Sequence, residues 1–489
     1  MSYVRPEFFL FFAFLLGVYL VVRDRSPRMA LLIAASLGYY AWAGLFDLLV
    51  FLAVVVFSYC AARLAQAFPR FRGFFLFTAV AALTAHLVFW KYVPWIVAGL
   101  QTLDPAFLGG RIIALRLPLG ISFFTFQGIA YLVDYWRETI VMMGFAEYLL
   151  YHSLFSHMIA GPIVRARQLL PQLRELSGPT REDLGAGAAL FARGLVKKML
   201  IADRVAPFVD MVFVSPGKWG RAALLWAAIG FAVQLWGDFS GYTDMGRGTA
   251  RMLGLRLPEN FMSPFLSRKP SEFWERWHIT LSHWARDYVF WPLRQWALAA
   301  FATALLLGLW HGSNWTFLLW GFYLRALFVA EDVIAVSPIG RLWSRLPDAL
   351  RHAVLIPLTL GANIAGIVIF RSESLSKLLE YIAALFAGPL GGAAPTAFGP
   401  TALLEHFYPA VALTFFFEAL FYRRLQNREW RPFGACAGST VVDAAARMLE
   451  ATFAAWSAGF LLGAAVAATA LAAIFFRQGD AGSFVYFSF

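Results

Sequence analysis

Apolar segments close to the length of a membrane-spanning helix recur along almost the whole chain. A helix needs about 20 mostly apolar residues to cross the hydrocarbon core of a bilayer. The pattern predicts an all-α polytopic membrane protein of roughly 11–12 spans, organised as a single integral-membrane domain over residues 1–489. The predicted spans lie near residues 7–22, 29–43, 45–62, 74–98, 117–136, 184–206, 222–243, 299–311, 313–333, 353–370, 402–421 and 452–475, and weaker candidates lie at 145–163 and 375–388.

The first apolar run, Phe8–Val22, is interpreted as a retained span, because no cleavage pattern of small residues follows it. Basic residues then alternate between loops: they occur near residues 23–28 and 63–72 and are absent from the turn at 44–47. Cytoplasmic loops carry an excess of Lys and Arg, so this alternation predicts a periplasmic N-terminus. Segment 145–163 has basic residues on both sides, which predicts a re-entrant or interfacial element.

The composition agrees with a membrane protein: 60% of the residues are hydrophobic and 14% are charged, whereas soluble domains carry about 25% charged residues. The net charge of +12 is interpreted as basic cytoplasmic loops rather than as a nucleic-acid-binding surface. The two cysteines, Cys60 and Cys436, support neither a disulfide framework nor a metal cluster. The sequence contains no HExxH, CxxC, GxSxG or phosphate-binding loop motif, so we predict no metal and no bound cofactor.

A segment rich in Trp, His and Arg lies at Arg268–Tyr288. Ser271 as N-cap and Glu272 in the first turn predict a helix start, and Glu272 and Arg276 form a pair one turn apart. His278 lies between the two faces of this predicted helix and can point into the protein interior. One of these faces carries bulky residues at helical spacing, and we expect it at the membrane interface. Its residues are Trp277, Leu281, Trp284, Tyr288 and Trp291.

A second segment, Leu305–Trp320, places His311 inside an otherwise apolar run. An imidazole in or near hydrocarbon is costly unless it has a partner or a task, so His311 is a candidate functional residue. Five further histidines have no acidic, Cys or His partner at metal-ligand spacing; they are His86, His152, His157, His352 and His406.

Further motifs occur in a fixed order along nearly the whole chain. They are LPLGISFFTFQGIAYLVDYWR (117–137), HMIAGPIVRARQLLPQL (157–173), GLVKKMLIADRVA (194–206), the run from DFSGYTDMG to HWARDY (238–288), GLWHGSNWTFLLWG (308–321), IFRSESLSKLLEYI (369–382) and FVYFSF (484–489). In this order they resemble the membrane-bound O-acyltransferase (MBOAT) family, and within it the bacterial alginate O-acetylation branch. The resemblance is strongest across residues 238–321.

The resemblance implies a multi-helix bundle with re-entrant or interfacial helices around a central channel that holds an active-site histidine. That histidine maps onto His311 in WHG, and the second family histidine maps onto His278 in RWH. The implied reaction moves an acyl group, in this branch acetyl, from a cytoplasmic thioester donor such as acetyl-CoA toward an acceptor outside the bacterial inner membrane. The implied partners are the acyl donor, the lipid bilayer and periplasmic acetyltransferases of a polysaccharide machinery, with no nucleic acid.

Acyl transfer from a thioester to a hydroxyl needs a group that accepts the hydroxyl proton. A histidine with a pKa near 6.5 suits that task, so we assign the general base to His311. His278 is expected to position a substrate or to polarise the thioester carbonyl. Arginine binds phosphate well, so arginines near residues 268–286 are candidates for the donor's phosphates, or else follow the positive-inside rule alone. The candidate substrate-binding residues are Asn314, one predicted helical turn beyond His311, with Trp310, Trp277, Arg276 and Arg286.

Other functions remain open on the sequence. The related branch transfers D-alanine to a cell-envelope polymer from a carrier-bound thioester. The short stretch from Trp291 to Arg294 leaves little room for a carrier-docking loop, which favours acetylation. A transporter or flippase with a pore-lining histidine would keep its ion or substrate coupling after His311→Gln. An acyltransferase would lose ester formation in the same variant. A catalytically idle scaffold would still support acetylation.

Overall fold

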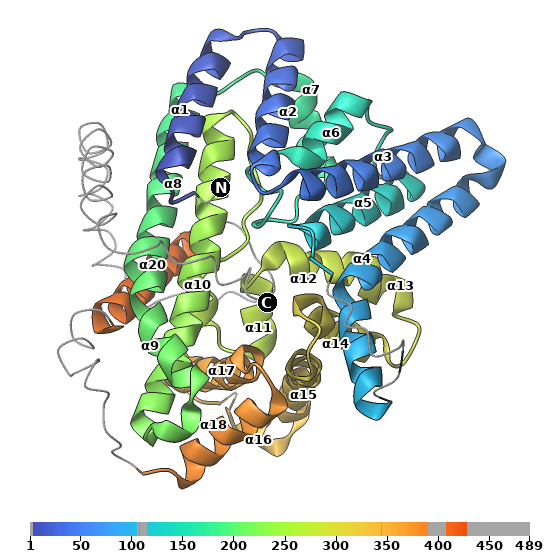
Figure 1. The fold of residues 1–489 in the computed structure, drawn as a ribbon. Coiled ribbons are helices and arrows are strands. Elements are labelled where there is room, and N and C mark those ends of the chain that lie inside the picture. Colours follow the sequence, from blue (N-terminus) through green and yellow to red (C-terminus); the bar gives the residue numbers. More distant parts are fainter. Residues whose placement is uncertain (1–2, 105–106, 108–114, 344, 390–406, 428–489) are drawn as a thin grey trace. The chain divides into compact units, whose positions relative to one another are not determined.

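The computed structural model describes residues 3–104, 107, 115–343, 345–389 and 407–427. Within these residues the secondary structure is helical and contains no β-strand, which confirms the predicted all-α class (Figure 1). The chain forms two compact units, Met1–Arg193 with Tyr242–Pro258, and Gly194–Gly241 with Glu259–Phe489. Two helices contribute to both units, α8 (Arg181–Val196) and α10 (Arg221–Met252). The single-domain organisation stays a prediction.

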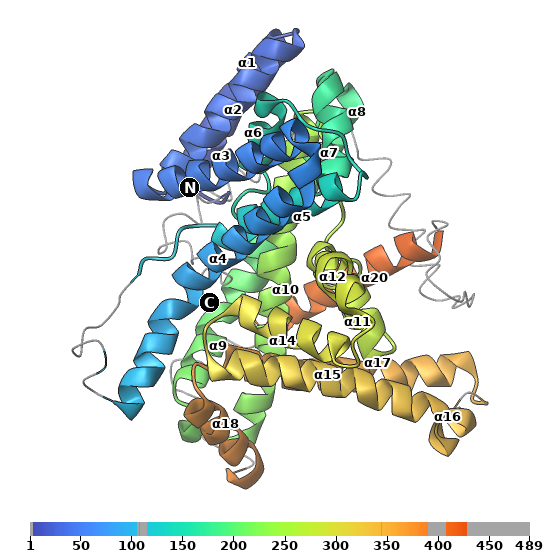
Figure 2. The ribbon, with the colours of Figure 1, turned by 90° about the vertical axis from the view of Figure 1, so that its right-hand side faces the viewer.

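The first unit is built on three apolar helices that lie side by side, α3 (Leu45–Ala67), α4 (Arg72–Leu103) and α5 (Ile121–Trp136) (Figure 2). Side chains such as Phe74 and Phe77 on α4 are exposed. A helix that is apolar all round, with large hydrophobic residues facing outward, is typical of a membrane span. The remaining helices of this unit are α1 (Pro6–Val21), α2 (Arg25–Ala41), α6 (Phe145–Ser153) and α7 (Ala166–Glu175), with parts of α8 and α10.

The predicted re-entrant or interfacial segment, residues 145–163, contains a short helix followed by irregular backbone. Helix α6 has 9 residues, which is too few to cross a bilayer, and residues 154–165 are non-helical but buried. Irregular backbone at membrane depth is tolerated where protein covers it. Buried histidines meet backbone carbonyls here: His152 Nδ1 lies 3.0 Å from Tyr148 O, and His157 Nε2 lies 3.1 Å from Tyr151 O.

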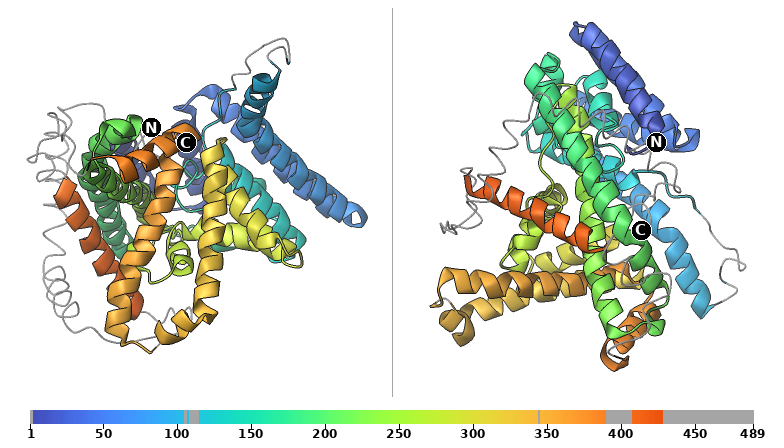
Figure 3. Two further views of the ribbon diagram at one scale, coloured as in Figure 1. Left: turned by 90° about the horizontal axis from the view of Figure 1, so that it is seen from below. Right: turned by 90° about the vertical axis from the view of Figure 1, so that its left-hand side faces the viewer.

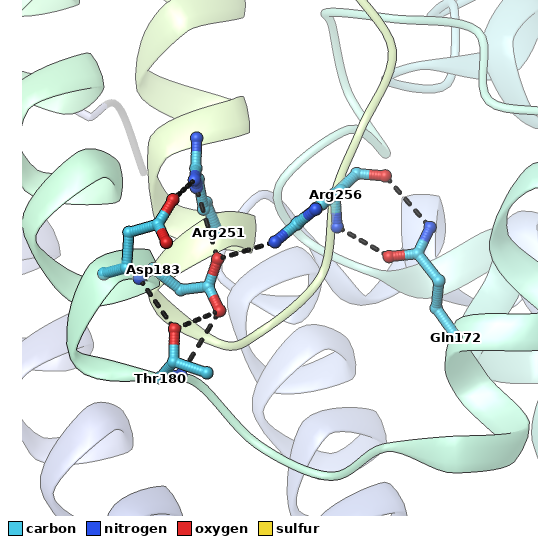
Figure 4. Close-up of polar contacts among 6 residues, drawn as sticks. Gln172, Thr180, Asp183, Arg251 and Arg256 are labelled. Carbon is cyan, nitrogen blue, oxygen red and sulfur yellow. Dashed lines mark hydrogen bonds and ion pairs between the residues drawn. The ribbon is translucent and has the colours of Figure 1, made fainter.

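A polar cluster ties the loop before α8 to the end of α10 in the same unit (Figure 4). Asp183 accepts hydrogen bonds from the Thr180 backbone N–H at 3.2 Å and hydroxyl at 2.7 Å. It also pairs with Arg251 at 3.4 Å and Arg256 at 3.5 Å. Gln172 holds the Arg256 backbone from both sides, accepting from its N–H at 2.7 Å and donating to its carbonyl at 3.0 Å. The cluster therefore fixes local chain geometry.

The second unit carries the segments with the candidate site. Helices α14 (Ala299–His311) and α15 (Trp315–Val336) pack against each other (Figure 2), and α15 leads through α16 (Pro338–Trp343) to α17 (Asp348–Arg371) (Figure 3). Its core is rich in buried aromatic residues, among them Trp236, Phe265, Phe273, Trp277, Phe317, Trp320 and Phe370. The other helices are α9 (Asp203–Val214), α11 (Pro270–Arg276), α12 (Ile279–Ala285), α13 (Trp291–Leu293), α18 (Leu375–Ala387) and α20 (Tyr408–Asn427), with parts of α8 and α10.

Four helical segments among the described residues are long and apolar enough to cross a membrane, namely Leu45–Ala67, Pro69–Leu103, Arg221–Met252 and Leu350–Arg371. Three shorter apolar helices, Pro6–Val21, Ala299–His311 and Tyr408–Leu420, also coincide with predicted spans. The predicted span 452–475 and the motif at 484–489 lie outside the described residues, as do His406 and Cys436.

The predicted span 184–206 lies within an unbroken helical stretch whose middle is π-helical rather than α-helical. Helix α8 ends at Val196, the backbone from Lys197 to Ala202 is π-helical, and α9 follows. At this turn the Lys198 ammonium lies 2.8 Å from carboxylate oxygens of both Asp203 and Asp238. Lys198 and Asp238 are buried, and a buried charge is tolerated only with such partners. The ion pairs account for charged residues inside an apolar segment.

Candidate active site

The predicted amphipathic helix around His278 is broken at that residue. Helix α11 ends at Arg276 and α12 begins at Ile279, and His278 between them has a left-handed φ of 43°. This conformation is uncommon for a residue other than glycine, and sequence periodicity does not reveal it. The predicted N-cap is also wrong: Lys269 is the N-cap residue of α11, and the Ser271 hydroxyl instead donates to Glu331 at 2.6 Å.

The prediction that the Trp-rich face lies at the membrane interface is wrong for its first three members. Trp277, Leu281 and Trp284 are buried in the protein, whereas Trp291 is exposed. Trp277 belongs to the aromatic core, where it stacks on Phe273 with ring centroids 5.6 Å apart. The break at His278 thus separates two short helices, and bulky side chains on both are buried in the protein. The predicted pair Glu272–Arg276 is confirmed at 2.6 Å.

Asn260 is the polar partner of His278, and it fixes which imidazole nitrogen carries the proton. The Asn260 side-chain oxygen accepts hydrogen bonds from the Thr280 backbone N–H at 3.1 Å and the Thr280 hydroxyl at 2.8 Å. His278 Nδ1 lies 3.2 Å from the same oxygen. An amide oxygen only accepts, so Nδ1 donates. In the neutral imidazole Nε2 then carries the lone pair. This atom is buried, and no described residue forms a hydrogen bond with it.

Burial lowers the pKa of His278 to about 3. The residue lies between α11 and α12, outside the helices that are candidates to span the membrane, and its side chain is 2% exposed. Desolvation disfavours the imidazolium ion. His278 is therefore neutral at physiological pH and offers a proton acceptor.

His311 is the last residue of α14, where the helix stops at Gly312. Its imidazole is half-buried and is surrounded by aromatic rings. The ring centroids of Phe370 and Trp320 lie 4.8 Å and 5.2 Å from that of His311, both edge-on. Aromatic walls of this kind exclude water without supplying charge. His311 thus lies at a helix end among aromatic side chains.

Trp310 links the two histidines. Its ring centroid lies 4.7 Å from that of His311 and 5.8 Å from that of His278, and its side chain is buried. One indole therefore contacts both imidazoles. The roles assigned to His278, His311 and Trp310 stay predictions.

The position of His311 depends on close packing between α14 and α15. A Cβ added at Gly321 on α15 would lie 2.7 Å from the Ala304 carbonyl oxygen on α14. A Cβ at Gly308 would collide with the Phe317 carbonyl oxygen. Small residues that let helix backbones approach are the usual solution where membrane helices meet.

Asn314 does not continue the helix of His311 as the spacing suggested. Gly312 and Ser313 separate the helices, and Asn314 is the N-cap of α15, where its side chain accepts a hydrogen bond from the Thr316 N–H at 3.3 Å. Its amide also donates to the Glu373 carbonyl at 2.6 Å. Both contacts are to backbone groups, so in this structure the Asn314 amide stabilises the chain at the start of α15.

The two candidate arginines differ in their surroundings. Arg276 is half-buried, paired with Glu272, and lies 5.4 Å from the Tyr422 ring centre. Arg286 is exposed and contacts Asp287 at 2.8 Å. Both guanidinium groups have a carboxylate partner, but the half-buried one is less accessible to a phosphate than the exposed one. The contacts therefore favour Arg286 over Arg276 as a ligand-binding group.

Sequence reasoning passed over two residues beside the site. Asn260 lies in the LPEN stretch within the quoted motif, yet a lone asparagine gave no signal of contact with His278. Phe370, in the IFR motif, packs its ring edge against His311. Both contacts join residues 18 or more positions apart, so only the folded chain reveals them. Within the described residues no group of three His, Cys, Asp or Glu side chains could hold a metal ion.

Comparison with known proteins places the chain in a family. The family model for MBOAT, the membrane-bound O-acyltransferase family, matches residues 121–336, which include both histidines. The probable alginate O-acetylase AlgI of Pseudomonas aeruginosa is 34% identical over 393 residues, covering 78% of this chain and 73% of the relative. The peptidoglycan O-acetyltransferase of Helicobacter pylori is 31% identical over 326 residues, covering 59% and 62%.

A more distant relative, the teichoic acid D-alanyltransferase of Bacillus subtilis, is 30% identical over 233 residues, covering 44% of this chain and 58% of the relative. The likeness to the alginate O-acetylase extends over far more of the chain. On this similarity and the matching domain, the chain belongs to the membrane-bound O-acyltransferase family and is an O-acyltransferase.

Proposed function

We propose that this protein transfers an acetyl group from a cytoplasmic thioester, acetyl-CoA or a similar donor, toward an exported polysaccharide or a periplasmic acetyltransferase that modifies one. The observation that carries the proposal is the contact of Trp310 with both His278 and His311, in a chain similar over 78% of its length to an alginate O-acetylase. The proposed location is the bacterial inner membrane, with the N-terminus on the periplasmic side.

The reaction joins the acceptor oxygen to the acyl carbon and breaks the carbon–sulfur bond of the donor. His311 is the proposed general base: it accepts the hydroxyl proton as the oxygen attacks, and the departing thiolate takes up a proton to leave as a thiol. A well-placed general base contributes about 10²–10⁴-fold in rate. His278 is neutral, and through Nε2 it is proposed to accept a hydrogen bond that positions the acceptor hydroxyl.

Water exclusion is the second contribution of the site. Phe370 and Trp320 edge the His311 imidazole, and Phe239 contacts the His278 ring edge-on at 4.7 Å. In such surroundings a thioester is protected from hydrolysis, and electrostatic interactions with the reacting groups are strengthened. No bound metal or cofactor takes part in the proposal; the acyl thioester is a co-substrate.

The donor's phosphates are proposed to meet exposed basic residues of the segment before and after α11–α12. Lys269 and Arg286 have side chains that are 61% and 50% exposed. Arg276, predicted from the sequence as a further phosphate ligand, is engaged with Glu272. We therefore assign phosphate contacts first to Arg286 and Lys269.

The test uses radiolabelled acetyl-CoA on inverted membrane vesicles, in which the cytoplasmic face is exposed. Wild-type protein is expected to release thiol and form an acetyl ester, and His311→Gln is expected to abolish both. His86→Gln, a control at a histidine that only accepts a 2.9 Å hydrogen bond from Trp90, is expected to keep activity. Full activity of His311→Gln would refute the base assignment. Transfer of D-alanine from a carrier-bound thioester, with no use of acetyl-CoA, would favour the D-alanyl branch.

A further inference from the structure

We propose that Asn260 is a positioning residue that fixes the tautomer of His278, so that Nε2 faces the reacting groups as a hydrogen-bond and proton acceptor. This inference rests on the proposed acyl transfer, because it states how His278 contributes to it. Asn260 does not touch the substrate in this account. It acts through the imidazole.

The orientation of the Asn260 amide is set by its neighbours. Oxygen and nitrogen of an amide side chain are distinguished by what they contact. The atom that meets the Thr280 backbone N–H at 3.1 Å must be an acceptor, because a backbone N–H only donates. That atom is therefore the oxygen, and the His278 Nδ1 beside it at 3.2 Å must carry the proton.

The backbone holds the two partners in register. The Ile279 N–H donates to the Asn260 carbonyl at 3.0 Å, and the Met262 N–H donates to the Arg276 carbonyl at 2.9 Å. These bonds run on either side of His278, whose left-handed φ is 43°. A residue kept in a sparsely populated conformation by its surroundings is typical of functional sites. Here the strained residue is the histidine itself. Asn260 holds its imidazole through the side-chain oxygen and holds the next residue, Ile279, through the backbone carbonyl.

Among the residues that the structure describes, no other group that could set the tautomer contacts His278. Phe239 of α10 and Trp310 of α14 contact its ring, and neither accepts a hydrogen bond at Nδ1. Asn260 is 0% exposed and His278 is 2% exposed. Nε2 is buried and has no hydrogen-bond partner within the described part of the chain. A buried acceptor of this kind is costly unless a ligand donates to it, which is the expected role of the acceptor hydroxyl.

The same logic operates in catalytic triads, where the third residue orients the imidazole and selects its tautomer. An alternative is that Asn260 only stabilises the turn between α11 and α12. The alternatives differ in what happens to the imidazole when the amide oxygen is removed while the fold is kept. Activity alone does not separate them, so the test reads the imidazole directly.

The experiment records ¹⁵N spectra of ring-labelled histidine in the full-length protein in liposomes at pH 7, with the His278 signals assigned from their loss in His278→Gln. Wild type is expected to show a protonated Nδ1 and an unprotonated Nε2. Asn260→Leu, which has a similar volume and no acceptor, is expected to lose this fixed tautomer. Thr280→Val, which removes the hydroxyl and keeps the backbone N–H, is the matched control and is expected to retain it.

Acetyl transfer is measured on the same preparations per folded protein. Asn260→Leu is expected to fall by about 10²-fold or more, within the range of a lost proton acceptor, and Thr280→Val by less than about 10-fold. A protonated Nε2 in wild type overturns the inference even if Asn260→Leu does not fold. Full transfer by His278→Gln also overturns it while leaving the proposed function intact. If wild type transfers no acyl group, the proposed function fails, and the spectra still report the tautomer.

Discussion

A single methyl group added between α14 and α15 tests whether helix packing positions His311. In Gly321→Ala the new Cβ would lie 2.7 Å from the Ala304 carbonyl oxygen and 3.1 Å from the Leu305 Cα. Ordinary van der Waals contact begins near 3.4 Å, so the helices must separate by several tenths of an ångström. Backbone atoms cannot yield as the end of a flexible side chain can, and Ala304 and His311 lie on the same helix.

The size of the effect follows from two general magnitudes. Overpacking of a well-packed core costs typically about 1–3 kcal/mol, which a large unit tolerates. A misplacement of about 1 Å in reacting groups can cost about 10²-fold in rate. We therefore expect Gly321→Ala to lose about 10-fold or more in acetyl transfer while staying folded. Gly308→Ala, closer to His311 and blocked by the Phe317 carbonyl, is expected to lose more.

The assay compares initial rates of acetyl-ester formation in inverted vesicles at equal membrane abundance. Gly361→Ala on α17 is the matched control, because a Cβ there meets nothing within 4 Å. It makes the same chemical change and is expected to keep the wild-type rate. Equal rates for Gly361→Ala, Gly321→Ala and Gly308→Ala would refute the claim that this packing sets the position of the base.

Three further predictions concern stability, each measured as thermal unfolding in detergent. Lys198→Met removes the ammonium that pairs with the buried Asp238 carboxylate and is expected to cost about 3–5 kcal/mol; an unchanged midpoint would contradict the ion-pair account. Glu331→Ala removes the acceptor for the Ser271 N–H and hydroxyl and is expected to cost about 1–3 kcal/mol, whereas Glu331→Gln should cost less. The pKa of His278 is lowered to about 3 in the folded protein, so below about pH 6.5 the unfolded chain binds a proton that the folded chain does not. The free energy of unfolding is therefore expected to fall as the pH drops from 6.5 toward 3, by about 2 kcal/mol at pH 5. His278→Phe should flatten that pH dependence, and an equal slope in both proteins would contradict it.

The sequence predicted the elements that rest on strong, local patterns. Apolar runs located the long helices, and the basic residues on both sides of 145–163 indicated a segment that does not cross. The break at His278 could not be predicted, because the bulky residues on either side keep helical spacing through it. The spacing of Trp277 and Trp284 was correct for an apolar face, yet periodicity does not tell lipid from a protein core.

In the candidate site too, the sequence indicated single residues but not the contacts between them. Two histidines in apolar or aromatic surroundings stood out from the sequence because an imidazole there is costly. Their shared contact with Trp310, and the Asn260 oxygen that orients His278, depend on residues brought together by folding. Asn314 was misplaced because helical spacing was extended across Gly312, where α14 ends.

The most direct test of the central claim measures ester-linked acetate on the exported polysaccharides of the host, comparing wild type with His311→Ala at matched membrane abundance. The account predicts that acetate present with wild type is lost with the variant, as it is when the whole protein is absent. Acetate that persists in His311→Ala but disappears when the protein is deleted would contradict the assignment of His311 as the base. Acetate unchanged by deletion of the whole protein would contradict the proposed acetyl transfer itself.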